Sequence, residues 1–210
     1  PGSYDEVISV KAIFPITPID FLGFIPLNKF AFVETTCTMW GEGLHLTGAS
    51  LYCSSDAAGN TAGVAGLLIS RARDLGMELT SNEIKQMLTM SADDIYRYCI
   101  TLTGGGCQPG WDAHYGYGRV NAKTAIDMLG DPDKGVPARI PPEARIMDPE
   151  WFAIIDPVKT PQLPVSAYMY ARGRNFSWEL QVAEGKEPKD RKFTTVASGN
   201  GSDAINDLIA

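Results

Sequence analysis

The chain has 210 residues, of which 44% are hydrophobic and 20% are charged, proportions typical of a globular protein with one domain and part of another. Its net charge of −7 argues against nucleic acid and anionic membranes as partners, because both require a basic surface. The most apolar stretch, residues 12–27, contains three prolines and Asp20, so it is not expected to span a bilayer. A long hydrophobic loop or a strand–turn–strand is expected there instead.

Three short strands are predicted in the first fifty residues. The run EVISVKAIF, residues 6–14, is rich in β-forming residues, and residues 30–33 form a second candidate strand. The segment GLHLTGAS, residues 43–50, alternates weakly and ends in small residues, which is typical of a short strand that leads into a loop. The chain starts without Met or a signal peptide, and we expect it to be an internal piece of a longer protein.

The segment CSSDAAGNTAGVAGLLIS, residues 53–70, passes from a polar turn into a stretch with no charge between Asp56 and Arg71. A helix is predicted to begin near residues 56–58 and to end at Gly76, which suits the C′ position. Its apolar residues form two stripes, so we expect nearly complete burial of its N-terminal half.

Two further helices are predicted from their capping residues. In TSNEIKQMLTM, Thr80 is followed three residues later by Glu83, which is the pattern of a capping box. In NAKTAIDML, Asn121 is the expected N-cap. The glycine-rich segment between these two helices, residues 91–118, is expected to be an irregular loop.

A linker is predicted at residues 131–145, where prolines, glycine and charged residues replace the helical pattern. It divides a first domain, residues 1–130, from a β-rich module, residues 146–210. In that module, two strands are expected around a turn at residues 172–175, and FTTVASG is a third candidate strand. The module is therefore predicted to be a partial all-β, sandwich-like domain.

The four cysteines form two pairs that are close in sequence, Cys37/Cys53 and Cys99/Cys107. The two local disulfides are the favoured pairing, and closing a loop of the size of the first would stabilise the fold by about 3 kcal/mol. Disulfides would place the protein in an oxidising compartment, hence outside the cell. Four buried thiols remain the alternative. A zinc site is not expected, because the sequence has no C-x-x-C and two histidines.

Five segments, in this order, resemble those of the subtilisin-like serine peptidases. They are PGSYDEVISVKA, CTMWGEGLHLTGAS, VAGLLIS, LTSNEIKQMLTMSAD and YGYGRVNAKTAI. The resemblance covers approximately residues 1–128. It implies an α/β fold, a parallel sheet with helices on both faces, and endopeptidase hydrolysis of protein or peptide substrates outside the cell. The β-rich module resembles modules that are appended to secreted bacterial members of this family.

In this family a Ser Oγ attacks the peptide carbonyl, a His that is oriented by an Asp removes its proton, and an Asn helps to bind the oxyanion. The family order implies that Asp, His and Asn lie upstream of Pro1. The family motif around the serine is G-T-S-x-A-x-P-x-V-A-G. An ungapped alignment on Val64–Gly66 places Ala58 at the nucleophile position, which would make the domain a pseudoenzyme.

An alternative register makes Ser55 the nucleophile, but it needs three extra residues before Val64–Gly66. If these were helical, they would rotate that segment by about 60° and advance it by about 4.5 Å. An active endopeptidase that uses Ser55 is therefore the second hypothesis, and an extracellular binding or adhesion protein that acts through the β-module is the third. Ser55 and Asp56 also have the residue types of helix N-caps.

Several other residues are expected to be structural. Asp112 and His114 resemble a catalytic dyad only superficially, because this loop of the family carries no catalytic histidine, and His45 is expected to be structural too. Gly59, Gly63 and Gly66 are expected to allow close packing. Structural calcium is possible at two aspartate groups, although solvated charge is the favoured interpretation: these are Asp93 with Asp94, and Asp131 with Asp133. The aromatic residues of the β-module are interpreted as core or rim rather than a sugar platform: Trp151, Phe152, Tyr168, Tyr170 and Trp178.

Overall fold

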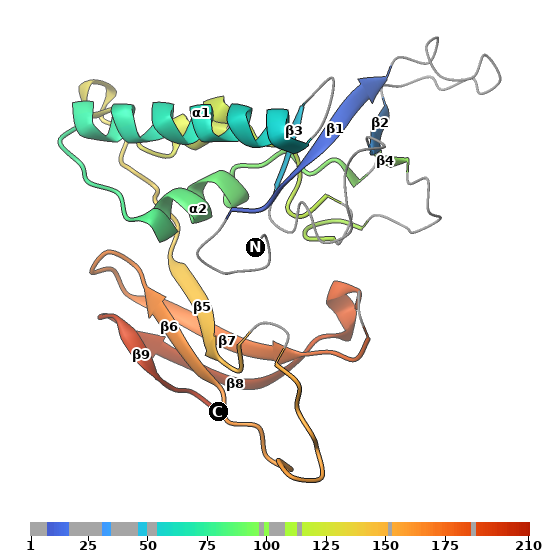
Figure 1. Ribbon diagram of the computed structural model, residues 1–210. Helices are drawn as coiled ribbons and strands as arrows, with labels where there is room; N and C mark the ends of the chain where they lie inside the picture. The colour runs from blue at the N-terminus through green and yellow to red at the C-terminus, as the bar shows by residue number, and fades with distance from the viewer. Residues whose placement is uncertain are drawn as a thin grey trace. The chain divides into compact units, whose positions relative to one another are not determined.

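The computed structural model describes nine parts of the chain, residues 8–16, 31–34, 46–49, 54–96, 99–100, 108–112, 115–150, 153–185 and 188–210. The chain divides into two compact units, Pro1–Ile140 and Pro141–Ala210 (Figure 1). The boundary falls inside the segment that the sequence analysis predicts to be a linker. Helix and sheet are combined in the first unit, whereas the sheets of the second unit are antiparallel.

The first unit contains a four-stranded mixed sheet in the order β3-β1-β2-β4. Its strands are β1 (Val10–Ile16), β2 (Ala31–Glu34), β3 (Leu46–Ala49) and β4 (Cys99–Ile100). Strand β1 pairs with β3 in parallel, and β2 pairs with β4 in parallel.

The central pair, β1 with β2, is antiparallel, so the sheet is mixed rather than parallel throughout. A parallel pair would need a crossover, usually a helix, between the two strands. The connecting sequence contains Pro18 and Pro26, which disfavour a helix there. Whether residues 12–27 form a long loop or a strand–turn–strand stays a prediction, because residues 17–30 lie outside the described parts.

Helix α1 (Ser54–Asp74) contacts β1 and β3. It ends in the predicted manner, because Gly76 has a φ of +69°. The amide of Gly76 donates to Arg73 at 2.9 Å, and the amide of Met77 donates to Ala72 at 2.8 Å. These two bonds form a Schellman motif, which satisfies carbonyls at the end of the helix. The prediction of Gly76 as the C′ residue is confirmed.

The expected burial of the N-terminal half of α1 is wrong for the described structure. Ala57 and Thr61 are buried there, but most of the residues around them are exposed, among them Asp56, Ala58 and Ala62. The described strands contact one stripe of the helix, and the opposite side faces no described element. Uncharged composition alone therefore does not determine how much of this helix is covered.

Helices α2 (Ser81–Met90) and α3 (Ala122–Asp127) contact α1 and each other. The capping box of α2 is present: the Thr80 amide donates to Glu83 Oε2 at 2.9 Å, and the Glu83 amide donates to Thr80 Oγ1 at 3.1 Å. The predicted N-cap of α3 is confirmed as well, because Asn121 Oδ1 accepts from the amide of Thr124 at 3.0 Å.

The three helices enclose a compact hydrophobic core. Its buried members are Leu68, Ala72, Met87, Leu88, Ala125, Leu129 and Ile140. The last of these belongs to the predicted linker, yet it is 4% exposed. The linker also contains a short 3-10 helix, η2 (Pro132–Lys134), so its first part is folded onto the first unit.

The second unit has two antiparallel sheets. One contains β5 (Glu143–Asp148), β6 (Ser166–Tyr170) and β9 (Ile205–Leu208) in the order β5-β6-β9. The other is a two-stranded ribbon of β7 (Phe176–Val182) and β8 (Thr194–Gly201), and the 3-10 helix η3 (Asp190–Lys192) precedes β8.

A tight turn connects β6 with β7 at the place where the sequence predicts one. Arg172 and Gly173 have φ values of +50° and +70°, and the amide of Arg174 donates to Ala171 at 3.0 Å. Two positive φ angles at the central positions define a type I′ turn. Within β6, Ala167 and Met169 are buried, whereas the strand residues that alternate with them are half-buried.

Candidate functional site

The first two turns of α1 hold both candidates for the nucleophile position. Ser55 lies in the first turn and Ala58 follows three residues later, and both are exposed. Val64–Gly66 lies further along the same uninterrupted helix. The structure therefore fixes how far Ser55, Ala58 and Val64–Gly66 are from one another along one rigid element.

The exposed side of α1 consists of small residues near Ala58. A methyl group added at Gly59, Gly63 or Gly66 would meet no described atom within 4 Å. The expectation that these glycines allow close packing is therefore not met by any described segment. Leu67 lies among them and is 57% exposed, so this side of the helix also presents apolar surface.

Asp93 is the centre of a polar cluster that joins the end of α2 to the start of α3. Its carboxylate accepts from Arg119 Nη2 at 2.7 Å and from Asn121 Nδ2 at 2.9 Å. Partial burial acts to raise the pKa of Asp93, but the two hydrogen bonds and the charge of Arg119 outweigh it and hold this pKa below its ordinary value. Asp93 is therefore ionised, and its hydrogen bonds link the end of α2 to the start of α3.

The loop around His114 is also organised by an aspartate. Asp112 is 3% exposed, and its Oδ1 accepts from the amide of Tyr115 at 2.8 Å. Its backbone also exchanges two hydrogen bonds with Gly116, at 2.9 and 3.0 Å. Asp112 therefore has a structural role in this turn. His114 itself lies outside the described residues, as does His45.

Three of the four aspartates that are candidates for calcium accept hydrogen bonds from protein donors, namely Asp93, Asp94 and Asp131. Asp94 accepts from the amides of Gly110, at 2.8 Å, and Tyr96, at 3.1 Å. Asp131 accepts from Lys134 Nζ at 2.8 Å. Within the described residues, no group of three or more His, Cys, Asp or Glu side chains could hold a metal ion.

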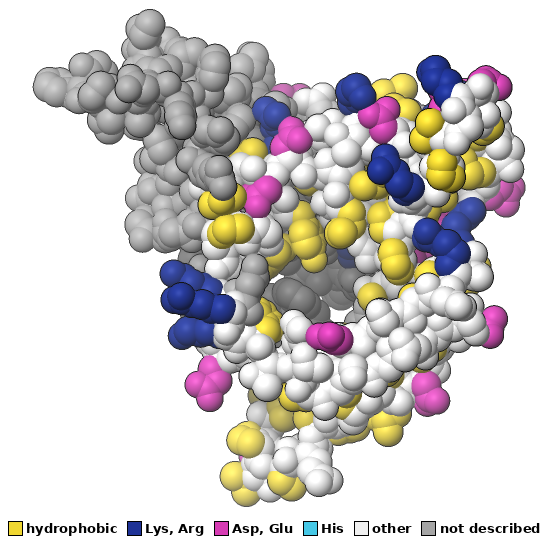
Figure 2. All heavy atoms as spheres, turned by 180° about the vertical axis from the view of Figure 1, so that it is seen from behind, with side chains coloured by type: hydrophobic (Ala, Val, Ile, Leu, Met, Phe, Trp, Pro, Cys, Tyr) yellow, Lys and Arg dark blue, Asp and Glu magenta, His cyan; other side chains and the backbone are white. Residues whose placement is uncertain are grey.

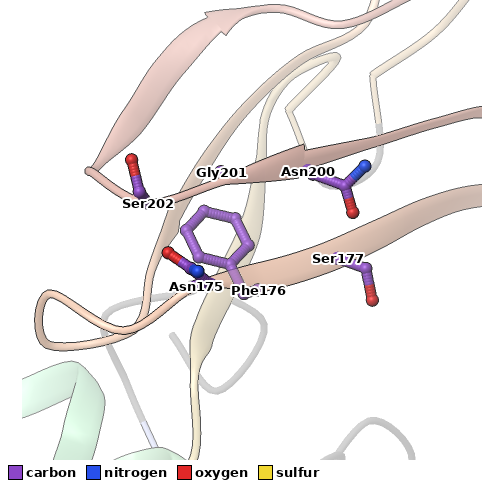
Figure 3. A pocket seen from close by; sticks show the side chains of 6 residues that line it. All are labelled: Asn175, Phe176, Ser177, Asn200, Gly201 and Ser202. Carbon is purple, nitrogen blue, oxygen red and sulfur yellow. The ribbon is translucent and has the colours of Figure 1, made fainter.

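A hollow of about 640 Å³ lies beside the start of β7 and the end of β8. Its lining residues are Asn175, Phe176, Ser177, Asn200, Gly201 and Ser202 (Figure 3). None of them is charged, and four carry amide or hydroxyl groups. No local sequence pattern predicts this hollow, because it depends on the pairing of Ser177 with Asn200 across two strands.

Three of the five aromatic residues that the sequence singles out in the β-module lie in its strands. Tyr168, Tyr170 and Trp178 are half-buried strand residues, while Trp151 and Phe152 lie outside the described parts. The ring of Trp178 covers Gly199, where an added methyl group would lie 2.8 Å from the indole. This contact supports the interpretation of Trp178 as a packing residue.

The proposed disulfides fall mostly outside the described residues. Cys37, Cys53 and Cys107 are not described, and Cys99 lies in β4. The described helices include none that is long and apolar enough to cross a bilayer. On the face shown in Figure 2, Lys and Arg side chains occur in several places, some of them close to Asp and Glu side chains.

Comparison with protein-family models and with curated proteins found no match to this chain.

Proposed function

We propose that residues 1–130 form the C-terminal part of a subtilisin-like serine peptidase domain whose nucleophile position is occupied by Ala58. The protein would then be a secreted pseudoenzyme that binds a protein or peptide without cleaving it. The observation that carries this proposal is the continuity of α1, which runs without a break from Ser54 through Val64–Gly66.

Helix geometry supports the register that places Ala58 at the nucleophile position. Each helical residue rotates the chain by about 100° and advances it by about 1.5 Å, so Ser55 lies about 4.5 Å along the axis from Ala58 and about 60° around it. A loop before the helix could have absorbed the three additional residues, but Ser55 already belongs to the helix. With Val64–Gly66 in the family position, Ala58 takes the place of the nucleophile, and a methyl group cannot attack a carbonyl.

The arrangement of the first unit supports the resemblance. The segment that resembles the first family motif overlaps the start of β1, and the second contains β3. These strands pair in parallel, and α1 follows β3 and contacts both of them. The last two motifs contain α2 and α3, each with the predicted capping residue. In a complete domain, we expect the small residues on the exposed side of α1 to pack against the part that carries Asp, His and Asn.

The alternative, an active peptidase that uses Ser55, is favoured by one observation: the residue is exposed in the first turn of α1. A negative charge on the adjacent Asp56 would oppose the developing oxyanion and so counts against it.

A fluorophosphonate probe applied to the full-length protein separates the two hypotheses, because it labels only an activated serine. We expect no labelling of the natural protein and new labelling of an Ala58→Ser variant if the upstream residues are intact. Ser70→Ala provides a control, because Ser70 is exposed on the same helix. Labelling of the natural protein that is lost in Ser55→Ala but retained in Ser70→Ala would overturn the pseudoenzyme proposal.

A further inference from the structure

The hollow beside the start of β7 and the end of β8 is lined by two copies of the same three-residue pattern. Asn175-Phe176-Ser177 and Asn200-Gly201-Ser202 both have the form Asn-x-Ser, where x is not proline. Of the seven asparagines in the sequence, these two begin such a pattern. Asn-x-Ser is the acceptor sequence for N-linked glycosylation in secreted proteins.

From this juxtaposition we propose that Asn175 and Asn200 are N-glycan acceptor sites, placed side by side at one end of the β7–β8 ribbon. The proposal rests on the proposed export of the protein but not on its resemblance to a peptidase.

Strand register brings the two patterns together although they are 25 residues apart in sequence. Phe176 pairs with Gly201, and Ser177 pairs with Asn200. In Figure 3, the side chains of Asn175 and Asn200 lie on either side of the Phe176 ring. The two amides therefore occupy separate positions at this end of the ribbon.

Both acceptor asparagines are accessible. Asn175 and Asn200 are exposed, as are the serines at the third position of each pattern, Ser177 and Ser202. Asn175 follows the type I′ turn directly, and Asn200 is the last residue but one of β8. Surface positions of this kind are those where a bulky, hydrophilic glycan can be attached without disturbing a core.

The glycine of the second pattern has a packing function. A methyl group at Gly201 would lie 2.5 Å from Cζ of Phe176 and 3.0 Å from Cδ1 of Ile205. The glycine thus leaves room for the Phe176 ring against β8. Glycans here would also hinder strand addition to the ribbon, whose two strands each have one side without a described partner.

The chemistry requires a polyprenyl-pyrophosphate-linked oligosaccharide as the donor. The Asn Nδ2 forms a bond to the anomeric carbon while the bond from that carbon to the pyrophosphate oxygen breaks. The pyrophosphate leaves with the electron pair, and the amide nitrogen loses one proton.

The test is expression of the full chain in a eukaryotic cell, with a cleavable secretory leader and an added Asn-Gly-Thr tag that reports entry into the secretory pathway. Peptide N-glycosidase F converts each glycosylated Asn to Asp, which peptide mass spectrometry assigns to a residue. We expect Asn175 and Asn200 to be converted, Ser177→Ala to abolish the first conversion, and Ser202→Ala to abolish the second. Ser198→Ala, an exposed change in the same strand, should retain both.

Glycan transfer takes place during translocation, so a variant that folds poorly still reports on its acceptor sites. A chain with a glycosylated tag and with both asparagines unmodified would overturn the proposal. Because the leader supplies export, this result is independent of whether the natural protein is secreted and of what Ala58 does.

Discussion

Asn121 donates from Nδ2 to Oδ1 of Asp93 at 2.9 Å, and its own Oδ1 caps α3 by accepting from the Thr124 amide at 3.0 Å. An asparagine amide has both donors and an acceptor, so this one side chain can serve two elements at the same time. The residue that caps the start of α3 is thereby attached to the segment after α2, three residues beyond the last helical residue, Met90. The packing of these two helices depends on the charge and position of Asp93.

We expect Asp93→Ala to lower the free energy of unfolding of the first unit by about 1 kcal/mol, because a partly exposed charged pair contributes modestly. Asp93→Asn should cost less, because it retains an acceptor for Asn121. Urea unfolding followed by the helical circular dichroism signal measures this loss, since the described α-helices all belong to the first unit. The exposed Asp133→Ala is the control, and an equal loss in that variant would contradict the role of Asp93.

The bonds of Asp93 with Arg119 and Asn121 also predict that the free energy of unfolding depends on pH. In the folded state, partial burial raises the pKa of Asp93, but the hydrogen bonds from Arg119 and Asn121 and the charge of Arg119 lower it further, to below the ordinary value. Its stabilisation should therefore be complete above the ordinary pKa of about 4 and be lost as the pH falls through the lower, folded-state pKa. The difference in unfolding free energy between the natural protein and Asp93→Asn should shrink in that acidic range, and a constant difference would refute the prediction.

Gly118→Ala should be the more damaging of two glycine substitutions in the loop before α3. At Gly118 the φ angle is +121°, and an added methyl group would lie 2.2 Å from the Asp93 carbonyl oxygen. We expect a loss of about 3 kcal/mol or more, because backbone strain and a backbone clash combine. Gly110 has a φ of +78°, and an added methyl group there would meet no described atom within 4 Å. Gly110→Ala therefore measures the backbone strain without a clash, and it should lower the free energy of unfolding by about 1 kcal/mol. If both variants lost the same amount of stability in thermal unfolding, the clash expected in Gly118→Ala would have been relieved by a local shift.

At the end of α1, Gly76→Ala should destabilise the first unit by about 1 kcal/mol, because an alanine is strained in the left-handed conformation that the Schellman motif requires. A steric clash is not the cause of this destabilisation, since an added methyl group at Gly76 would meet no described atom within 4 Å. Gly76→Asn should restore part of the loss, because asparagine tolerates positive φ better. If both variants lost the same amount, conformation at this residue would not be the cause.

Within α1, Gly63→Ala should have the opposite effect and stabilise this chain by about 0.5–1 kcal/mol, because alanine favours a helix interior and the added methyl group meets no described atom. In a longer protein where a further segment covers this side of α1, the same substitution should destabilise instead. Measuring both proteins by denaturant unfolding therefore tests whether the small residues serve close packing. Stabilisation in both would count against the covered helix that the subtilisin-like resemblance implies.

The predictions that the structure confirms are those made from neighbouring residues. The Thr80–Glu83 capping box, the Asn121 N-cap and the Gly76 C′ residue each depend on groups within about one helical turn of one another. A sequence places such groups together whatever the rest of the chain does, because the helix itself sets their spacing. The strands that became β1, β2, β3 and β8 were also predicted, from runs of β-forming residues.

The features that the sequence did not predict depend on contacts between distant segments. Asp93 is bonded to residues that lie 26 and 28 positions further along the chain. The segments that contain Asn175 and Asn200 lie together only through the register of β7 with β8. The antiparallel pairing of β1 with β2 and the exposed side of α1 likewise depend on the path of the chain. Local propensity sets the helices and strands, whereas burial and the grouping of polar side chains follow from which elements lie against each other, and only the tertiary structure decides that.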